Sequence, residues 1–95
     1  MLSMETIRAN VREAASRYPV KRVELFGSYA DGTATEKSDV DFLVEFNDSR
    51  KSLLTLLGFQ ERLIELFNMD VDVVEVPLKQ NSRLIIENRV NVYEA

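Results

Sequence analysis

Helical and strand-like patterns of apolar residues alternate along this chain of 95 residues. The first pattern predicts a helix that Ser3 caps and Tyr18-Pro19 ends, because apolar residues recur there at the spacing of one helix face. This face is formed by Met4, Ile7, Val11, Ala14 and Ala15. A longer helix is predicted over residues 52–67, and we expect its apolar stripe to lie in the core. The stripe consists of Leu53, Leu56, Leu57, Leu63, Ile64 and Phe67.

Shorter apolar runs predict strands over residues 22–26, 40–46 and 70–76, the last of them stopped by Pro77. A last helix is predicted near residues 81–88, followed by a short extended end at residues 90–93. The chain contains no linker, repeat or low-complexity tract, so residues 1–95 are expected to form a single domain. The order of elements indicates an α/β (α+β) fold in which helices cover a small mixed sheet.

The most informative polar pattern is Gly27-Ser28, a gap of ten residues, and Asp39-Val40-Asp41. Because alternate residues of a strand share one face, Asp39 and Asp41 are expected to project together, about 6 to 7 Å apart. At an effective dielectric constant near 20, their repulsion costs roughly 2 to 3 kcal/mol, which favours a cation between them. Oxygen ligands of this kind suit a hard cation such as Mg²⁺.

The predicted strand before Gly27 runs directly into the Gly-Ser pair. Gly27 lacks a Cβ, so a ligand or another backbone can approach it closely. Ser28 is expected to cap the turn or short helix that follows, leaving N–H groups and its hydroxyl for phosphate oxygens. Each motif alone is more typical of a turn or a solvated strand end. Together, at this spacing, they should arise by chance about once per thousand chains of this length, which favours a phosphate and metal site.

Composition excludes several classes of function. The net charge of −4 and the lack of a basic run argue against binding to nucleic acid. The chain has no cysteine and no histidine, so acid–base chemistry would fall to carboxylates. No apolar stretch approaches ~18 residues, and the first residues lack a basic, hydrophobic leader. We therefore expect a soluble cytoplasmic protein that does not associate with a membrane.

The Gly27-Ser28 and Asp39-Val40-Asp41 elements resemble the signature of the DNA polymerase beta-like nucleotidyltransferase superfamily. In its short length and flanking residues, the chain is similar to the minimal nucleotidyltransferases found as MNT antitoxins beside HEPN-domain toxins. This resemblance implies the minimal polymerase beta-like fold over essentially the whole chain. It also implies a third carboxylate on a later strand, at Asp72. Asp70 lies on the same strand face and would take that role if the match were shifted.

The resemblance further implies the chemistry of the site. Asp39 and Asp41 would hold two Mg²⁺ ions, and Asp72 would ligate the ion that activates the attacking hydroxyl, acting as the base or assisting it. Gly27 and Ser28 would hold the outer phosphates of ATP. Relatives often carry a basic residue just before the second glycine or two positions before it. This chain instead has Ala30-Asp31 before Gly32, which removes positive charge beside the triphosphate.

The acceptor of the nucleotide is expected to come from another molecule, because larger superfamily members hold it with a second domain that this chain lacks. In the MNT resemblance, the acceptor is a tyrosine hydroxyl of a HEPN toxin, a helical ribonuclease. The chain would adenylylate (AMPylate) it as the antitoxin of a type VII toxin–antitoxin pair. Two alternatives remain: a catalytically idle module that acts by occlusion, and a nucleotidyltransferase subunit with a small-molecule acceptor such as an antibiotic. The intact acids favour an enzyme, because occlusion needs no clustered carboxylates.

Overall fold

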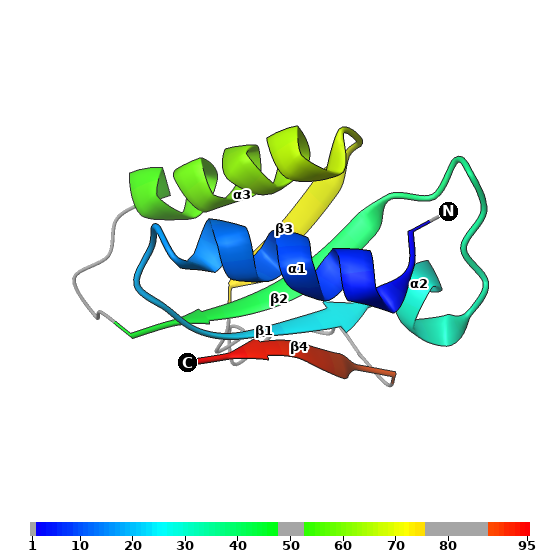
Figure 1. Ribbon diagram of the computed structural model, residues 1–95, viewed down its shortest axis with the longest axis horizontal. Coiled ribbons are helices and arrows are strands. Elements are labelled where there is room, and N and C mark those ends of the chain that lie inside the picture. Colours follow the sequence, from blue (N-terminus) through cyan, green and yellow to red (C-terminus); the bar gives the residue numbers. More distant parts are fainter. Residues whose placement is uncertain (1, 48–52, 76–87) are drawn as a thin grey trace, which may run out of the picture.

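The computed structural model describes residues 2–47, 53–75 and 88–95 as a sheet with helices packed on one face (Figure 1). This arrangement confirms the predicted α/β fold with a helix-covered sheet. The elements, in chain order, are α1 (Met4–Ala15), β1 (Val20–Phe26), α2 (Ser28–Asp31), β2 (Val40–Phe46), α3 (Leu53–Phe67), β3 (Val71–Glu75) and β4 (Val90–Glu94). None of the helices in these described ranges is long and apolar enough to cross a membrane.

The four strands form one mixed sheet in the order β3-β2-β1-β4. β1 runs antiparallel to both β2 and β4, whereas β2 and β3 are parallel and are joined through α3. Parallel strands begin at the same edge of a sheet, so the first residues of β2 and β3 meet: Val40 pairs with Val71 and Asp41 with Asp72. This register positions the candidate site.

The core lies between the sheet and the two long helices. Alternate residues of β1 and β2 point into it, as the period of two in a strand requires. Figure 1 shows α1 and α3 side by side over this face. The fully buried contributors include Val23 and Leu25 of β1, Phe42 and Val44 of β2, Ile7 and Val11 of α1, and Phe59 and Leu63 of α3.

Most predicted boundaries agree with the structure. Ser3 caps α1 as expected, and its side chain accepts a hydrogen bond of 3.1 Å from the Thr6 N–H. β1 begins two residues earlier than predicted, because Val20 already pairs with Phe46 of β2. The helix predicted near residues 81–88 lies outside the described residues except for its last position. Residues 52 and 76, the predicted start of the long helix and end of the third strand, also lie outside them.

The apolar stripe predicted for α3 is wrong for three of its members. Leu53, Leu57 and Ile64 are exposed, with fractions of 68%, 43% and 37%. The buried side is formed instead by Phe59, Leu63 and Phe67. At roughly 100° per residue, the three exposed residues lie roughly 120 to 160° around the helix from Phe59. The helix simply carries more apolar residues than its single core-facing side can cover.

Candidate active site

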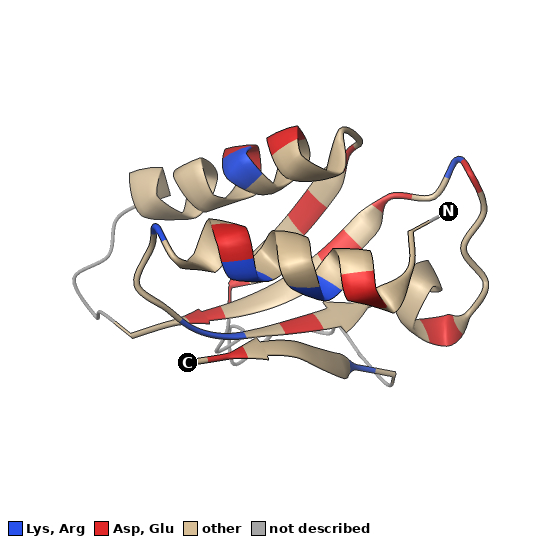
Figure 2. Cartoon of the chain, in the orientation of Figure 1, with Lys and Arg blue, Asp and Glu red and all other residues tan. Residues whose placement is uncertain are grey.

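Asp41 and Asp72 lie side by side on neighbouring strands because of the parallel register of β2 and β3. Figure 2 shows acidic residues toward both ends of these two strands, and Asp41 and Asp72 belong to the end where both strands begin. Asp41 is half-buried and Asp72 is exposed. Their carboxyl groups lie close enough for the charge of Asp72 to act on Asp41.

The pKa of Asp41 is raised above its ordinary value of 3.8, first by burial of the carboxyl group. The charge and the close side chain of Asp72, and then the charge of Asp39, raise this pKa further. Asp39 itself is exposed and precedes β2. Within the described ranges, no three acidic side chains are grouped closely enough to form a ready metal-binding cluster. The structure therefore brings Asp41 and Asp72 together, and Asp39 contributes to the raised pKa of Asp41 from outside β2.

Asp70 occupies a different place from Asp72. It is the last residue before β3, it is exposed, and its carbonyl oxygen accepts a hydrogen bond of 3.3 Å from the Val40 N–H. The carboxylates that act on Asp41 are those of Asp72 and Asp39. Of the two acids considered for the third position, the geometry favours Asp72.

Gly27 ends β1 directly beside Asp41, because Phe26 pairs with Asp41 across the two strands. Its backbone angles, φ 77° and ψ −153°, belong to a region that is essentially restricted to glycine. A Cβ built on Gly27 would collide with the Asp41 carboxylate. The space left by the missing side chain is therefore taken by the Asp41 side chain of this same chain, which the sequence did not indicate.

The expectation that Ser28 caps the following helix is wrong. Gly27 is the N-cap of α2, and Ser28 is the first helical residue. The carbonyl oxygen of Gly27 accepts hydrogen bonds from the N–H groups of Ala30 (3.1 Å) and Asp31 (3.0 Å). The N-cap position falls on Gly27, one residue before the predicted cap. Its backbone angles are ones that glycine adopts readily and other residues do not. The Ser28 hydroxyl is thus not used for capping, and the first N–H groups of a helix lack partners within it.

The segment before β4 also reaches the Gly-Ser turn. The side-chain amide of Asn88 donates a hydrogen bond of 2.8 Å to Asp31 Oδ1 at the end of α2. Next to it, Arg89 Nη1 lies 4.0 Å from Glu24 Oε1 on β1. No local pattern indicates these contacts, because they join residues more than fifty positions apart and depend on the pairing of β1 with β4.

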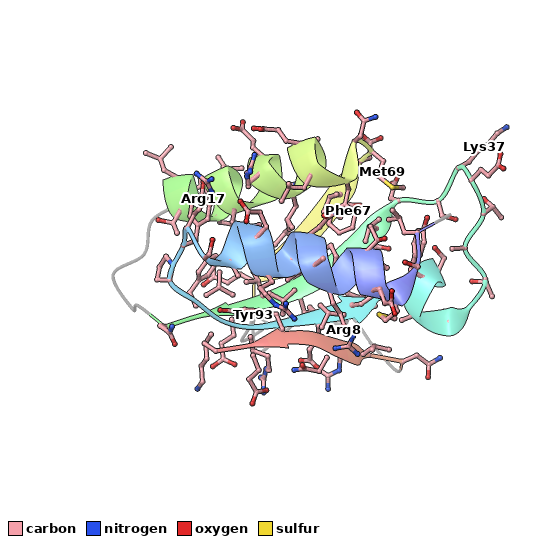
Figure 3. The ribbon with its side chains drawn as sticks, viewed as in Figure 1. Arg8, Arg17, Lys37, Phe67, Met69 and Tyr93 are labelled. Atoms are coloured by element: carbon pink, nitrogen blue, oxygen red, sulfur yellow. The ribbon has the colours of Figure 1, made fainter. Side chains whose placement is uncertain are left out.

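Lys37, in the loop between the Gly-Ser pair and Asp39, does not lie at the site. It is exposed, and its side chain points away from the body of the molecule (Figure 3). Two further basic residues, Arg50 and Lys51, lie outside the described residues. The departure at Ala30-Asp31 is therefore not offset by Lys37.

Comparison with known proteins gives a consistent family assignment. Residues 7–92 match the family described as the nucleotidyltransferase domain. The protein adenylyltransferase MntA of Thermococcus cleftensis is 40% identical over 78 residues, which cover 78% of this chain and 78% of that protein.

Two solved structures share the fold. A crystal structure of a toxin–antitoxin with AMP-PNP superimposes with a TM-score of 0.70 at 22% identity, covering 99% of this chain and 75% of that chain. A tri-AMPylated Shewanella oneidensis HEPN toxin in complex with MNT antitoxin gives a TM-score of 0.69 at 16% identity, covering 98% and 74%. At these identities the likeness concerns the fold alone.

Proposed function

Since the chain belongs to the nucleotidyltransferase domain family, we propose that it transfers AMP from ATP to a hydroxyl group of a partner protein. The partner would be a HEPN-family toxin and the acceptor a tyrosine, so that the chain acts as the antitoxin of a type VII pair. The 40% identity to a protein adenylyltransferase supports protein adenylylation. The fold shared with toxin–antitoxin complexes, one of them with AMP-PNP, supports the toxin partner and the nucleotide.

The observation that carries the proposal is the carboxyl pair of Asp41 and Asp72 beside Gly27-Ser28. Acids that served only solubility would be expected farther apart, because the charge of Asp72 disfavours ionisation of Asp41. Perturbed carboxyl groups next to a strand-to-helix turn are typical of a functional site. Occlusion of a partner alone requires no such pair.

The donor atoms at this site fit Mg²⁺. Asp39, Asp41 and Asp72 offer only oxygen ligands, which this ion prefers, and after burial the charges of Asp72 and Asp39 contribute to the raised pKa of Asp41. We propose that these three residues hold two Mg²⁺ ions. When bound, Mg²⁺ neutralises charge on the phosphates and lowers the pKa of the attacking hydroxyl.

The chain's own groups would divide the remaining tasks. Gly27 and Ser28 would bind the outer phosphates through the N–H groups and hydroxyl at the start of α2. Asp72 is exposed, so an acceptor hydroxyl can approach its carboxylate, which would take or help to take the proton. Asp41 is half-buried and its carboxylate lies against Gly27, so it would hold metal next to the phosphate-binding turn.

The proposal is tested by co-expressing the chain with the neighbouring reading frame and adding Mg²⁺ and ATP labelled at the α-phosphate. We expect one labelled protein band, which Asp41→Ala abolishes. ATP labelled at the γ-phosphate should leave the same band unlabelled, because adenylyl transfer releases pyrophosphate. Label on a small molecule instead would identify the alternative acceptor. Capture of the partner without any label would identify an idle binding module.

A further inference from the structure

On the face of the sheet that carries Asp41, the described basic side chain of β1, Arg22, already pairs with acids, at 2.8 Å from Glu45 and 3.7 Å from Glu24. Val23, Leu25 and Phe42 point into the core beneath the helices, so their neighbours Glu24 and Asp41 point to the opposite face. Arg8 and Arg17 belong to α1, which covers the core side, and Lys37 points away from the body (Figure 3). Within the part of the chain that the structure describes, a triphosphate bound at the Gly-Ser turn would therefore take its cation from another element.

Arg89 is placed next to that turn by contacts on either side of it. Val90, the residue after it, pairs with Leu25 near the end of β1. Asn88, the residue before it, donates its hydrogen bond of 2.8 Å to Asp31 at the end of α2. The turn at Gly27 lies between Leu25 and Asp31, so the backbone of Arg89 runs alongside it.

The guanidinium group of Arg89 lies on the same face as the acids. It lies near Glu24, whose Oε1 is 4.0 Å from Arg89 Nη1. Glu24 pairs with Leu43, two residues along β2 from Asp41, so the side chains of Glu24 and Asp41 share a face.

The ion pair between Arg89 and Glu24 is weak, so Arg89 can exchange Glu24 for another partner. The same oxygen of Glu24 lies closer to Arg22 Nε, at 3.7 Å, than to Arg89. The Arg89 side chain is 48% exposed, and exposed ion pairs of this length contribute little to stability. Its planar guanidinium can donate two parallel hydrogen bonds to phosphate oxygens, which strengthens such contacts.

We infer that Arg89 binds the outer phosphates of the nucleotide at the Gly27-Ser28 turn. Its guanidinium would supply the positive charge that is missing just before Gly32, where this chain has Asp31. The inference rests on the proposed function, because it names a further ligand of the same nucleotide. It assigns the segment before β4 a direct role in substrate binding.

Calorimetric titration of the full chain with ATP and with AMP, both with Mg²⁺, tests this assignment. Arg89→Met keeps the length of the side chain and removes the guanidinium. It should weaken ATP binding about tenfold, or ~1.4 kcal/mol, and leave AMP binding unchanged. The matched control is Arg17→Met, which removes an exposed arginine that likewise pairs with one glutamate, Glu13, at 3.5 Å. This control should bind ATP as the parent does.

A second variant separates phosphate binding from a merely structural pairing with Glu24. Glu24→Gln removes the competing carboxylate, so ATP should bind at least as tightly as to the parent. If Glu24→Gln weakens ATP binding as much as Arg89→Met does, or if Arg89→Met binds ATP like the parent, the assignment is overturned. ATP binding by the parent would leave the proposed function standing in either case. A parent chain that binds no ATP would overturn both proposals.

Discussion

Among single residues, Asp41 and Gly27 are the most tightly linked pair of the site. The carboxylate of Asp41 fills the space beside Gly27 that any other side chain would need. The position of the acid and the conformation of the turn therefore depend on each other. A change at Gly27 is expected to act on catalysis through Asp41 as well as on the local backbone.

Gly27→Ala should lower the free energy of unfolding by at least about 1 to 3 kcal/mol, because the new residue must adopt backbone angles restricted to glycine. It should also displace Asp41 and abolish transfer. Gly32→Ala is the matched control, since Gly32 has a positive φ of 79° but a Cβ there would meet nothing within 4 Å. Urea denaturation and the transfer assay of both variants check this. If a folded Gly27→Ala variant transferred label as fast as the parent, the expected displacement of Asp41 would be contradicted.

Asp41→Asn should raise the melting temperature of the metal-free protein at neutral pH. The folded pKa of Asp41 lies above its ordinary value of 3.8, so the ionised carboxylate destabilises the fold above the folded pKa. This penalty disappears as the pH falls through the folded pKa to below 3.8, where both states are protonated. A gain of about 1 kcal/mol corresponds to ~4 to 8 °C in a domain of this size.

Thermal melts of parent and Asp41→Asn at several pH values check this prediction. The difference between the two proteins should shrink toward zero in acid. Asp39→Asn, at the exposed acid before β2, should give a smaller gain. A variant that melts below the parent at neutral pH would show that the Asp41 carboxylate is structural.

At the scale of elements, the register of β3 against β2 places Asp72 beside Asp41. Among the described strands, β3 lies at the edge of the sheet and pairs with β2. On this strand, the side-chain amide of Gln60 from α3 donates a hydrogen bond of 2.8 Å to the carbonyl oxygen of Val71. Val71 immediately precedes Asp72, so Gln60 ties the helix to the strand at the site.

Gln60→Met should lower stability by about 0.5 to 1.5 kcal/mol, the usual net value of one hydrogen bond. It should also slow transfer by the folded protein, because Gln60 no longer holds the strand residue that precedes Asp72. Glu61→Met, at the next and exposed position of α3, controls for the effect of methionine on the helix. Rates are compared at a temperature where every variant is folded. Equal rates for Gln60→Met and Glu61→Met would contradict a positioning role.

Local patterns predicted the elements better than the contacts between them. The helix at Met4–Ala15 and the strand at Val40–Phe46 follow from periodicity and capping, which are properties of neighbouring residues. The exposed leucines of α3 were not predictable, because periodicity shows that residues are apolar but not which side the sheet covers. The pairing of Asp41 with Asp72 and the contacts of Arg89 depend on strand order, which is set by the whole fold.

For the molecule as a whole, the described long helices both cover one face of the sheet, and Asp41 points to the other. In the proposed function, a protein acceptor would approach Asp41 from the side opposite α1 and α3. We expect the co-expressed partner to remain bound without nucleotide, through an interface of roughly 1,200 to 2,000 Å². Asp41→Asn should retain this binding, because the proposal separates recognition from transfer. Pull-down of both proteins checks this, and recovery of the parent alone would point to a small-molecule acceptor.

The central claim is that Asp41 and Asp72 form the transfer site, and the most direct measurement is the initial rate of label transfer by Asp72→Asn and Asp70→Asn. Both substitutions remove one negative charge from the start of the same strand, but only Asp72 lies beside Asp41. The partner protein, Mg²⁺ and ATP labelled at the α-phosphate are supplied in each reaction. We predict that Asp72→Asn loses at least about a hundredfold in rate, the lower limit for a positioned acid or base, and that Asp70→Asn stays close to the parent. Equal rates for the two variants, or a larger loss for Asp70→Asn, would contradict the account.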